Sequence, residues 1–340
     1  MRTSMSVKSE ASAIPVARRD WLPAILPVAL ALLALPLIGN GATWVTLTFA
    51  GIAMGMMIFL MASGLTLVFG LMDVLNFGHG AFIAVGAYVA AAVLLHLSGF
   101  TQVDSLWSNL GVTVLAAGAA VIVTAVLGVV FERLLIRPVY GQHLKQILIT
   151  MGGFIVAEQG LHAIFGPVPL SLPLPTSFRG SFSFGDVTIE KFRLGAMLVG
   201  LAVFFIATLI LTKTKIGLLV RAGVENPEMV ESLGYRVRRL FIAVFVAGSA
   251  LAGLGGSLWA LYRETVTAAM GMEIMVLVFI VIIVGGLGSV GGCFIGSLLV
   301  ALLANYAGFL EPKVALISNI LLMALVLMWR PQGLYPVAKR

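Results

Sequence analysis

Charged residues are scarce in this sequence. Of its 340 residues only 10% are Asp, Glu, Lys or Arg, whereas 60% are hydrophobic. A soluble globular domain carries roughly 25% charged residues, so the charges present are too few to cover a water-facing surface. This composition excludes an ordinary soluble protein. The long apolar stretches instead indicate an all-α membrane protein that crosses the bilayer many times.

Cysteine and enzyme motifs are also lacking. Cys293 is the single cysteine, which excludes an intramolecular disulfide and a zinc site built from cysteines. The chain has no His-Glu-x-x-His pair, no Gly-x-Ser-x-Gly elbow and no Gly-x-x-x-x-Gly-Lys-Ser/Thr phosphate loop. We therefore expect no catalytic residues, no metal and no cofactor bound by this chain. If ATP drives its function, separate subunits must hydrolyse it.

Ten apolar segments are long enough, or nearly so, to cross the hydrocarbon core as helices. They are residues 21–38, 44–69, 80–97, 110–131, 147–165, 194–211, 240–262, a segment ending near 284, 293–306 and 314–328. Arg18 and Arg19 before the first segment superficially resemble an export signal. Because the segment is long and nine others follow it, we expect a retained first span.

The basic residues predict how these spans are oriented. The net charge is +7, and the Lys and Arg residues form short blocks between apolar runs, as topology signals do; we expect no nucleic-acid partner. If both termini are cytoplasmic, 16 of the 21 Lys and Arg residues lie on the cytoplasmic side. The expected organisation is a cytoplasmic tail (1–20), a permease domain (21–330) with an external loop (166–193) and a cytoplasmic loop (212–239), and a cytoplasmic tail (331–340).

The external loop contains four prolines and then alternating apolar and polar residues from Phe182 to Ile189. This pattern is typical of a proline-stiffened loop with a short hairpin.

Polar residues lie just before the third membrane segment and within the fifth. Asp73, Asn76 and His79 recur at every third position, so a helix would place them along one side. Glu158 lies four residues before His162 and could pair with it. Polar groups at membrane depth often mark a transport pathway, so the first three residues and Glu158 are candidates to line or support one. A structural hydrogen-bonding role is the alternative for each of them.

A glycine run precedes the ninth segment. Glycine disfavours a helix and exposes backbone polar groups, so residues 285–292 cannot be helical throughout. The run could be a tight, densely packed turn or a flexible gate, and the two are compatible. Its glycines are Gly285, Gly286, Gly288, Gly291 and Gly292.

The cytoplasmic loop contains the signals of a short helix. Asn226 can cap free N–H groups, Pro227 fits the first helical position and Glu228 complements the positive end of the helix dipole. Gly234 is a stop signal. An amphipathic helix here could lie on the membrane or dock to a soluble partner. The candidate coupling residues are Arg221, Asn226, Pro227, Glu228, Met229, Val230, Leu233 and Gly234, and the expected apolar face consists of Met229, Val230 and Leu233.

Several of these stretches together resemble a known family. Residues 64–70 read GLTLVFG and residues 75–80 read LNFGHG; residues 132–138 read ERLLIRP; residues 284–292 read VGGLGSVGG. With the cytoplasmic loop, they are similar to the motifs of branched-chain amino-acid ABC importer permeases, in particular the LivH-like subunit type. Gly78 departs from the family, which usually has alanine there.

The resemblance implies a permease fold in the bacterial inner membrane. It implies a second related permease, two cytoplasmic ATP-binding subunits and a periplasmic solute-binding protein as partners, with residues 221–234 contacting an ATP-binding subunit. The cargo it implies is a branched-chain or other amino acid, an amide such as urea, or an aromatic or other carboxylate. An ion-coupled secondary transporter, using Glu158, His162 or Asp73, or a channel remains the alternative at this point.

Overall fold

The computed structural model describes residues 21–225 and 227–335, which form a bundle of helices with four short strands. Seven helical runs are long and apolar enough to cross a membrane: α2 (Gly41–Met72), α3 (His79–His96), α5 with its irregular extension (Leu106–Val139), α6 (His143–Phe165), α7 (Lys191–Lys213), α10 (Val237–Arg263) and α12 (Val290–Leu310). The shorter apolar helices are α1 (Leu22–Ile38), α11 (Met270–Gly285) and α13 (Pro312–Trp329). Each of the ten predicted segments forms a helix, and the all-α membrane architecture is confirmed.

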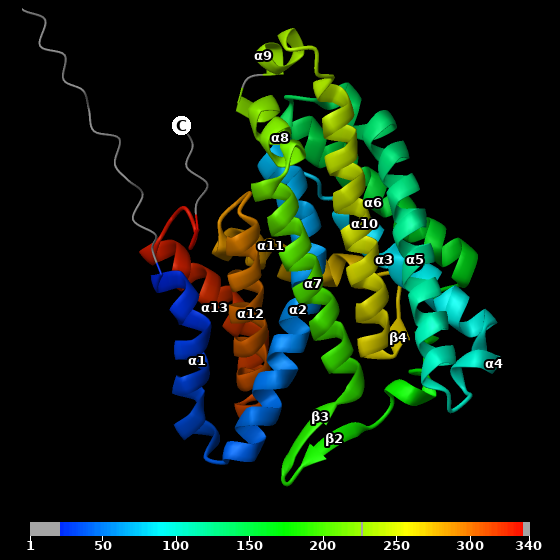
Figure 1. Cartoon of the computed structure of the whole chain (residues 1–340), viewed down its shortest axis with the longest axis vertical. Helices are drawn as coiled ribbons and strands as arrows, with labels where there is room; N and C mark the ends of the chain where they lie inside the picture. The colour runs from blue at the N-terminus through cyan, green and yellow to red at the C-terminus, as the bar shows by residue number, and fades with distance from the viewer. Residues whose placement is uncertain (1–20, 226, 336–340) are drawn as a thin grey trace, which may run out of the picture.

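The connections gather at the two ends of the bundle. In Figure 1 the upper end carries α8 (Lys215–Glu225), α9 (Pro227–Ser232) and the connection from α5 to α6. The lower end carries α4 (Ser98–Thr101) and the β2–β3 hairpin. The long loops predicted for opposite sides of the membrane, 166–193 and 212–239, therefore lie at opposite ends.

Helix α2 forms the centre of the bundle. Residues Met57 to Ala62 of α2 are completely buried, and the helix packs against both α10 and α12. Glycines allow the closest approach, because a Cβ atom on Gly64 would collide with the carbonyl oxygen of Gly248, and one on Gly55 would lie 3.1 Å from that of Ser297. Small residues at helix contacts in a membrane let backbones approach closely.

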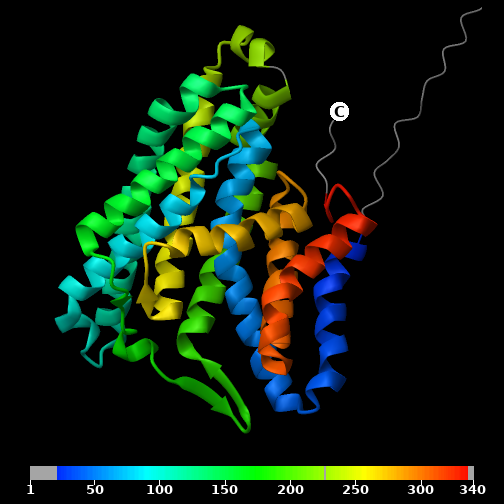
Figure 2. The ribbon, with the colours of Figure 1, turned by 180° about the vertical axis from the view of Figure 1, so that it is seen from behind.

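Helix α11 runs in a different direction from its neighbours. Figure 2 shows it in gold, lying across the bundle at mid-height between α10 and α12. Its 16 residues span about 24 Å, less than the roughly 30 Å of a hydrocarbon core. The eighth predicted segment is therefore a short crossing helix rather than one parallel to the others.

Three of the four strands lie in the loop between α6 and α7, and the fourth follows α10. β2 (Ser181–Phe184) and β3 (Val187–Glu190) pair antiparallel, with Phe182 opposite Ile189; this is the hairpin predicted from the alternating pattern. β1 (Leu170–Ser171) pairs with β4 (Thr265–Val266), a contact that the sequence did not predict. It ties the start of the loop to the end of α10.

Candidate translocation and coupling sites

A short non-helical segment, which we call the α2–α3 break, separates α2 from α3. Helix α2 ends at Met72, and Asp73 takes a left-handed conformation with φ +51°. Residues 73–78 are not helical, so Asp73, Asn76 and His79 do not lie along one side of a helix, and that prediction is wrong. The physical reason is that the left-handed backbone at Asp73 changes the direction of the chain, so the residues after it no longer continue the face of α2.

Two side chains of α6 satisfy the backbone of this break. The Leu75 N–H donates to Gln146 Oε1 at 3.4 Å, and the Phe77 N–H donates to the Thr150 hydroxyl at 3.1 Å. Gln146 and Thr150 are themselves buried. Unpaired backbone groups are costly inside a bilayer, so these contacts make the break tolerable. Neither residue was predicted from the sequence, although two polar residues four apart in an apolar helix were a usable signal.

Asn76 and His79 lie in the interior beside this break. Asn76 is 1% exposed and His79 is fully buried. The His79 Nε2–H donates to the Met61 carbonyl of α2 at 2.8 Å. His79 Nδ1 and both polar atoms of the Asn76 side chain have no hydrogen-bond partner among the described residues. The centre of the bundle thus holds polar groups with unused hydrogen-bonding capacity.

Asp73 and Glu158 lie apart from that pair. Asp73 is exposed, and its Oδ2 is 3.8 Å from Nε2 of His143 at the start of α6. Glu158 lies on α6 and is partly exposed. Within the described part of the chain no ion pair joins Glu158 to His162. The structure therefore brings Asn76 and His79 together and leaves Asp73 at the surface.

The glycine run forms a tight turn between α11 and α12. Gly286 and Gly288 have φ +102° and +81°, values that favour glycine. Gly285 packs so closely on Gly292 that neither position has room for a Cβ, whereas Gly291 has no neighbour within 4 Å of that site. The expected packing role thus fits Gly285 and Gly292 and not Gly291.

The chain after α13 closes this turn. The Leu334 N–H donates to the Val284 carbonyl, and the Tyr335 N–H donates to the Gly285 carbonyl, each at 2.9 Å.

The region around the α2–α3 break is in contact with the glycine turn. A Cβ atom on Gly288 would lie 2.7 Å from the Cα of Gly70, at the end of α2. The Phe77 ring lies 4.8 Å from the Phe279 ring of α11, measured between ring centroids. The polar break and the glycine turn are therefore parts of one region, which their sequence positions did not reveal.

Helix α9 lies in the loop between α7 and α10, where the sequence predicted it. It ends as expected: the Tyr235 N–H donates to the Val230 carbonyl at 3.2 Å, and Gly234 has φ +87°. Met229 and Leu233 are 52% and 68% exposed, but Val230 is 1% exposed. Val230 therefore packs into this chain and is not part of an exposed apolar face, which corrects that expectation. Arg221 lies in α8, Pro227 and Glu228 start α9, and the predicted cap Asn226 lies outside the described residues.

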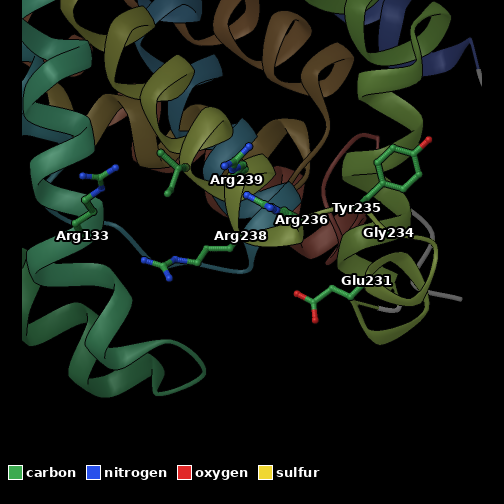
Figure 3. A pocket seen from close by; sticks show the side chains of 8 residues that line it. Arg133, Glu231, Gly234, Tyr235, Arg236, Arg238 and Arg239 are labelled. Atoms are coloured by element: carbon green, nitrogen blue, oxygen red, sulfur yellow. The ribbon is translucent and has the colours of Figure 1, made fainter.

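A basic pocket opens beside α9. It has a volume of about 570 Å³, and we call it the arginine pocket. In Figure 3, Arg133, in the irregular turn after α5, faces the arginines at the start of α10. Its lining residues are Arg133, Glu231, Gly234, Tyr235, Arg236, Arg238, Arg239 and Ile242.

A buried carboxylate is next to Arg133 in the chain. Glu132 is fully buried and its Oε1 accepts a hydrogen bond from the Tyr140 hydroxyl at 3.3 Å. Burial, and then the negative charge of Glu132, raises the pKa of Tyr140 well above its usual value. This hydrogen bond joins the two ends of the irregular turn that follows α5.

Known proteins resemble this chain over most of its length. Residues 47–329 match the family described as "Branched-chain amino acid transport system / permease component". The chain belongs to this family. As a member, it is a multi-pass membrane permease component and not an enzyme. No solved structure matches it, and among the described residues no group of three or more His, Cys, Asp or Glu side chains could hold a metal ion.

Named relatives of this permease cover most of its length. It is 27% identical over 292 residues to the high-affinity branched-chain amino acid transport system permease protein BraD of Pseudomonas aeruginosa, covering 84% of this chain and 93% of that protein. It is 26% identical to LivH of Salmonella typhimurium, again over 84% and 93% of the two chains. It is also 28% identical to LivM of Escherichia coli, covering 84% of this chain and 69% of LivM.

Proposed function

We propose that this permease forms the membrane passage of an ATP-driven importer for branched-chain or other amino acids, in a bacterial inner membrane. The family match over residues 47–329 carries the proposal. The bundle of apolar helices supports it. The ion-coupled transporter or channel has no support from the matched family.

The proposed importer contains a second permease, two ATP-binding subunits and an external solute-binding protein. LivH and LivM of Escherichia coli are two permeases named for the same transport system, and both resemble this chain. That double resemblance supports a pair of related permeases. Since no phosphate loop occurs in this sequence, ATP hydrolysis must come from other chains.

Uptake into proteoliposomes tests the proposal. The assembled importer is reconstituted with ATP inside, and the binding protein and radiolabelled leucine outside. Leucine should accumulate when an ionophore has collapsed the proton gradient, and should not accumulate without ATP. Uptake that follows the gradient and ignores ATP would establish the secondary transporter instead. Competition by unlabelled valine, glutamate or urea then identifies the cargo class.

We also propose that Asn76 and His79 support the translocation route. Their unused hydrogen-bonding atoms lie in an otherwise apolar interior, where polar groups are costly and often functional. Asp73 would act near one end of the route, and Glu158 would support it from α6. Alanine at Asn76 or His79 should lower uptake while the complex still assembles. Normal uptake by both variants would refute this role.

A third proposal makes residues 221–234 the coupling segment and 166–193 the external loop. An exposed Met229 and Leu233 beside a glycine stop give α9 the form of a compact docking element. The other end of the bundle, with the β2–β3 hairpin, would then face the binding protein.

A further inference from the structure

The lining of the arginine pocket carries net positive charge, from four arginines and one carboxylate. None of the guanidinium groups of Arg133, Arg236, Arg238 and Arg239 makes an ion pair or hydrogen bond with any residue that the structure describes. Glu231 is the one carboxylate among the lining residues. Several arginines around one space repel each other unless an anion joins them. The pocket is thus suited to a ligand with concentrated negative charge.

The pocket lies at the edge of the membrane-spanning region. Arg133 belongs to the apolar run Leu106–Val139, and Arg238 and Arg239 belong to the first turn of the run Val237–Arg263. Residues at such positions meet lipid headgroups, and arginine there extends its charged end toward them while its stem lies along apolar surface.

An exposed apolar stripe leads along α5 to this pocket. Ile122, Val126 and Val130 of α5 are 65%, 58% and 44% exposed and lie on one face of that helix; Arg133 follows in the irregular turn after it. Ile242 of α10 is an apolar side chain among the pocket's lining residues. The surface therefore combines an exposed apolar helix face with a pocket suited to an anion. This combination fits an amphiphilic ligand better than a wholly polar one.

We propose that the arginine pocket binds the phosphate group of an anionic phospholipid whose acyl chain lies along the exposed apolar face of α5. Guanidinium groups bind phosphate oxygens through two parallel hydrogen bonds, and basic pockets between membrane helices hold anionic lipid headgroups. A volume of about 570 Å³ accommodates a phosphate with its glycerol. The proposal rests on the proposed function only in assigning this end of the bundle to the cytoplasmic leaflet.

The bound lipid would connect the membrane to the coupling segment. Glu231, Gly234 and Tyr235 follow or belong to α9, and they border the same pocket as the arginines of α10. A headgroup in this space would therefore hold the end of α9 against α5 and α10. Anionic lipid would thereby influence how α9 is presented to an ATP-binding subunit.

Native mass spectrometry of the assembled importer, purified in mild detergent, tests the assignment. The complex is incubated with phosphatidylglycerol or phosphatidylcholine, and the retained lipid is counted. Wild type should retain phosphatidylglycerol preferentially. Arg238→Gln/Arg239→Gln should weaken retention at least about tenfold, and Arg133→Gln alone about fivefold. Glu231→Gln should strengthen it, because the one carboxylate that lines the pocket loses its charge.

The matched control is Lys213→Gln/Lys215→Gln, which removes two exposed charges from the same end of the bundle but outside the pocket. It should retain phosphatidylglycerol within about twofold of wild type. Equal loss in the lysine and arginine variants, or no headgroup preference in wild type, would overturn the proposal.

Two further arms separate other ligands. Excess inorganic phosphate should not displace the lipid, because the acyl chain contributes to binding; full displacement would assign the pocket to a free anion. Arginine variants that release the ATP-binding subunit but keep the lipid would assign it to an acidic protein segment. Both results overturn the lipid site, and because lipid retention is counted without transport, ATP-driven uptake still tests the proposed function by itself.

Discussion

At the scale of single residues, the permease combines groups that a bilayer disfavours with partners that make them tolerable. Gln146 and Thr150 accept from the backbone between α2 and α3. Tyr140 donates to the buried carboxylate of Glu132, and His79 donates to Met61. Each contact replaces a hydrogen bond that water would supply elsewhere, so losing one partner leaves the other buried and unsatisfied.

Tyr140 should make stability depend on pH in the alkaline range. Its pKa is raised in the folded protein, so the neutral form is favoured there. That stabilisation is complete below the unfolded pKa of about 10 and is lost as pH rises toward the folded value. The midpoint of thermal unfolding in detergent should therefore fall above about pH 10.

Tyr140→Phe should abolish this alkaline component and lower stability at neutral pH by roughly 1–3 kcal/mol, because Glu132 loses its donor. The control is Tyr262→Phe, since the Tyr262 hydroxyl makes no hydrogen bond with the described residues. It should behave as wild type. An unchanged alkaline profile in Tyr140→Phe would mean that another group causes it, and unchanged stability at neutral pH would mean that the Glu132 contact is not formed.

The glycine turn allows a paired substitution within one run. Gly288→Ala places a Cβ against Gly70 at a positive φ, so we expect a loss of roughly 2–4 kcal/mol and impaired uptake. Gly291→Ala meets nothing within 4 Å and lies in α12. It should be neutral or stabilise by up to about 1 kcal/mol. Thermal unfolding of both variants measures this, and equal behaviour would refute the close contact.

At the scale of elements, two short helices, α11 and α9, are central to the proposed coupling between an ATP-binding subunit and the membrane helices. α11 crosses the bundle instead of running along it (Figure 2), and its end is held by the glycine turn and by the chain after α13. α9 stands at the end of the bundle with Val230 anchored inward and Met229 and Leu233 outward. An element anchored on one face and exposed on the other can transmit force between a soluble partner and the membrane helices.

The exposed face of α9 should hold an ATP-binding subunit. Burying an apolar side chain of this size contributes about 1.5–3 kcal/mol, whereas a carboxylate entering the same groove would be unpaired. Met229→Asp/Leu233→Asp should therefore abolish co-purification of that subunit and ATP-dependent uptake, with normal membrane insertion. Phe184→Asp, an equally exposed change on the hairpin at the other end, should keep both. Full retention by the α9 variant would favour a helix lying on the membrane surface.

At the scale of the whole molecule, charge and architecture agree. The long loop that carries a block of basic residues, 212–239, lies at the end opposite the hairpin (Figure 1). A surplus of basic residues marks the cytoplasmic side of membrane proteins. The cytoplasmic placement of this end is therefore a prediction that labelling can test.

Single cysteines should report opposite sides of the membrane. In a Cys293→Ala background, where the one native thiol is buried, Asp186→Cys in the hairpin should react with an impermeant maleimide in intact cells. Glu231→Cys, also exposed, should react only after permeabilisation. The reversed pattern would mean that the protein has the opposite orientation in the membrane. α9 would then face away from the cytoplasm and could not dock to an ATP-binding subunit.

The sequence by itself determined the class of protein, the position of every long helix, the hairpin and the stop of α9 at Gly234. These features depend on local properties: the length of an apolar run, alternation over a few residues, and the backbone freedom of glycine. The family motifs are equally local, which is why the family was recognisable before any contact between segments was known.

Only the tertiary structure decided how those elements meet. It turned α11 across the bundle, set Gly288 against Gly70, aimed Val230 inward and separated Asp73 from Asn76 and His79. Each outcome depends on contacts between segments distant in the chain or on one backbone turn that redirects the residues after it. Hydrophobic periodicity carries little of that information here, because in lipid most faces of a helix are apolar whether they meet a neighbour or the membrane.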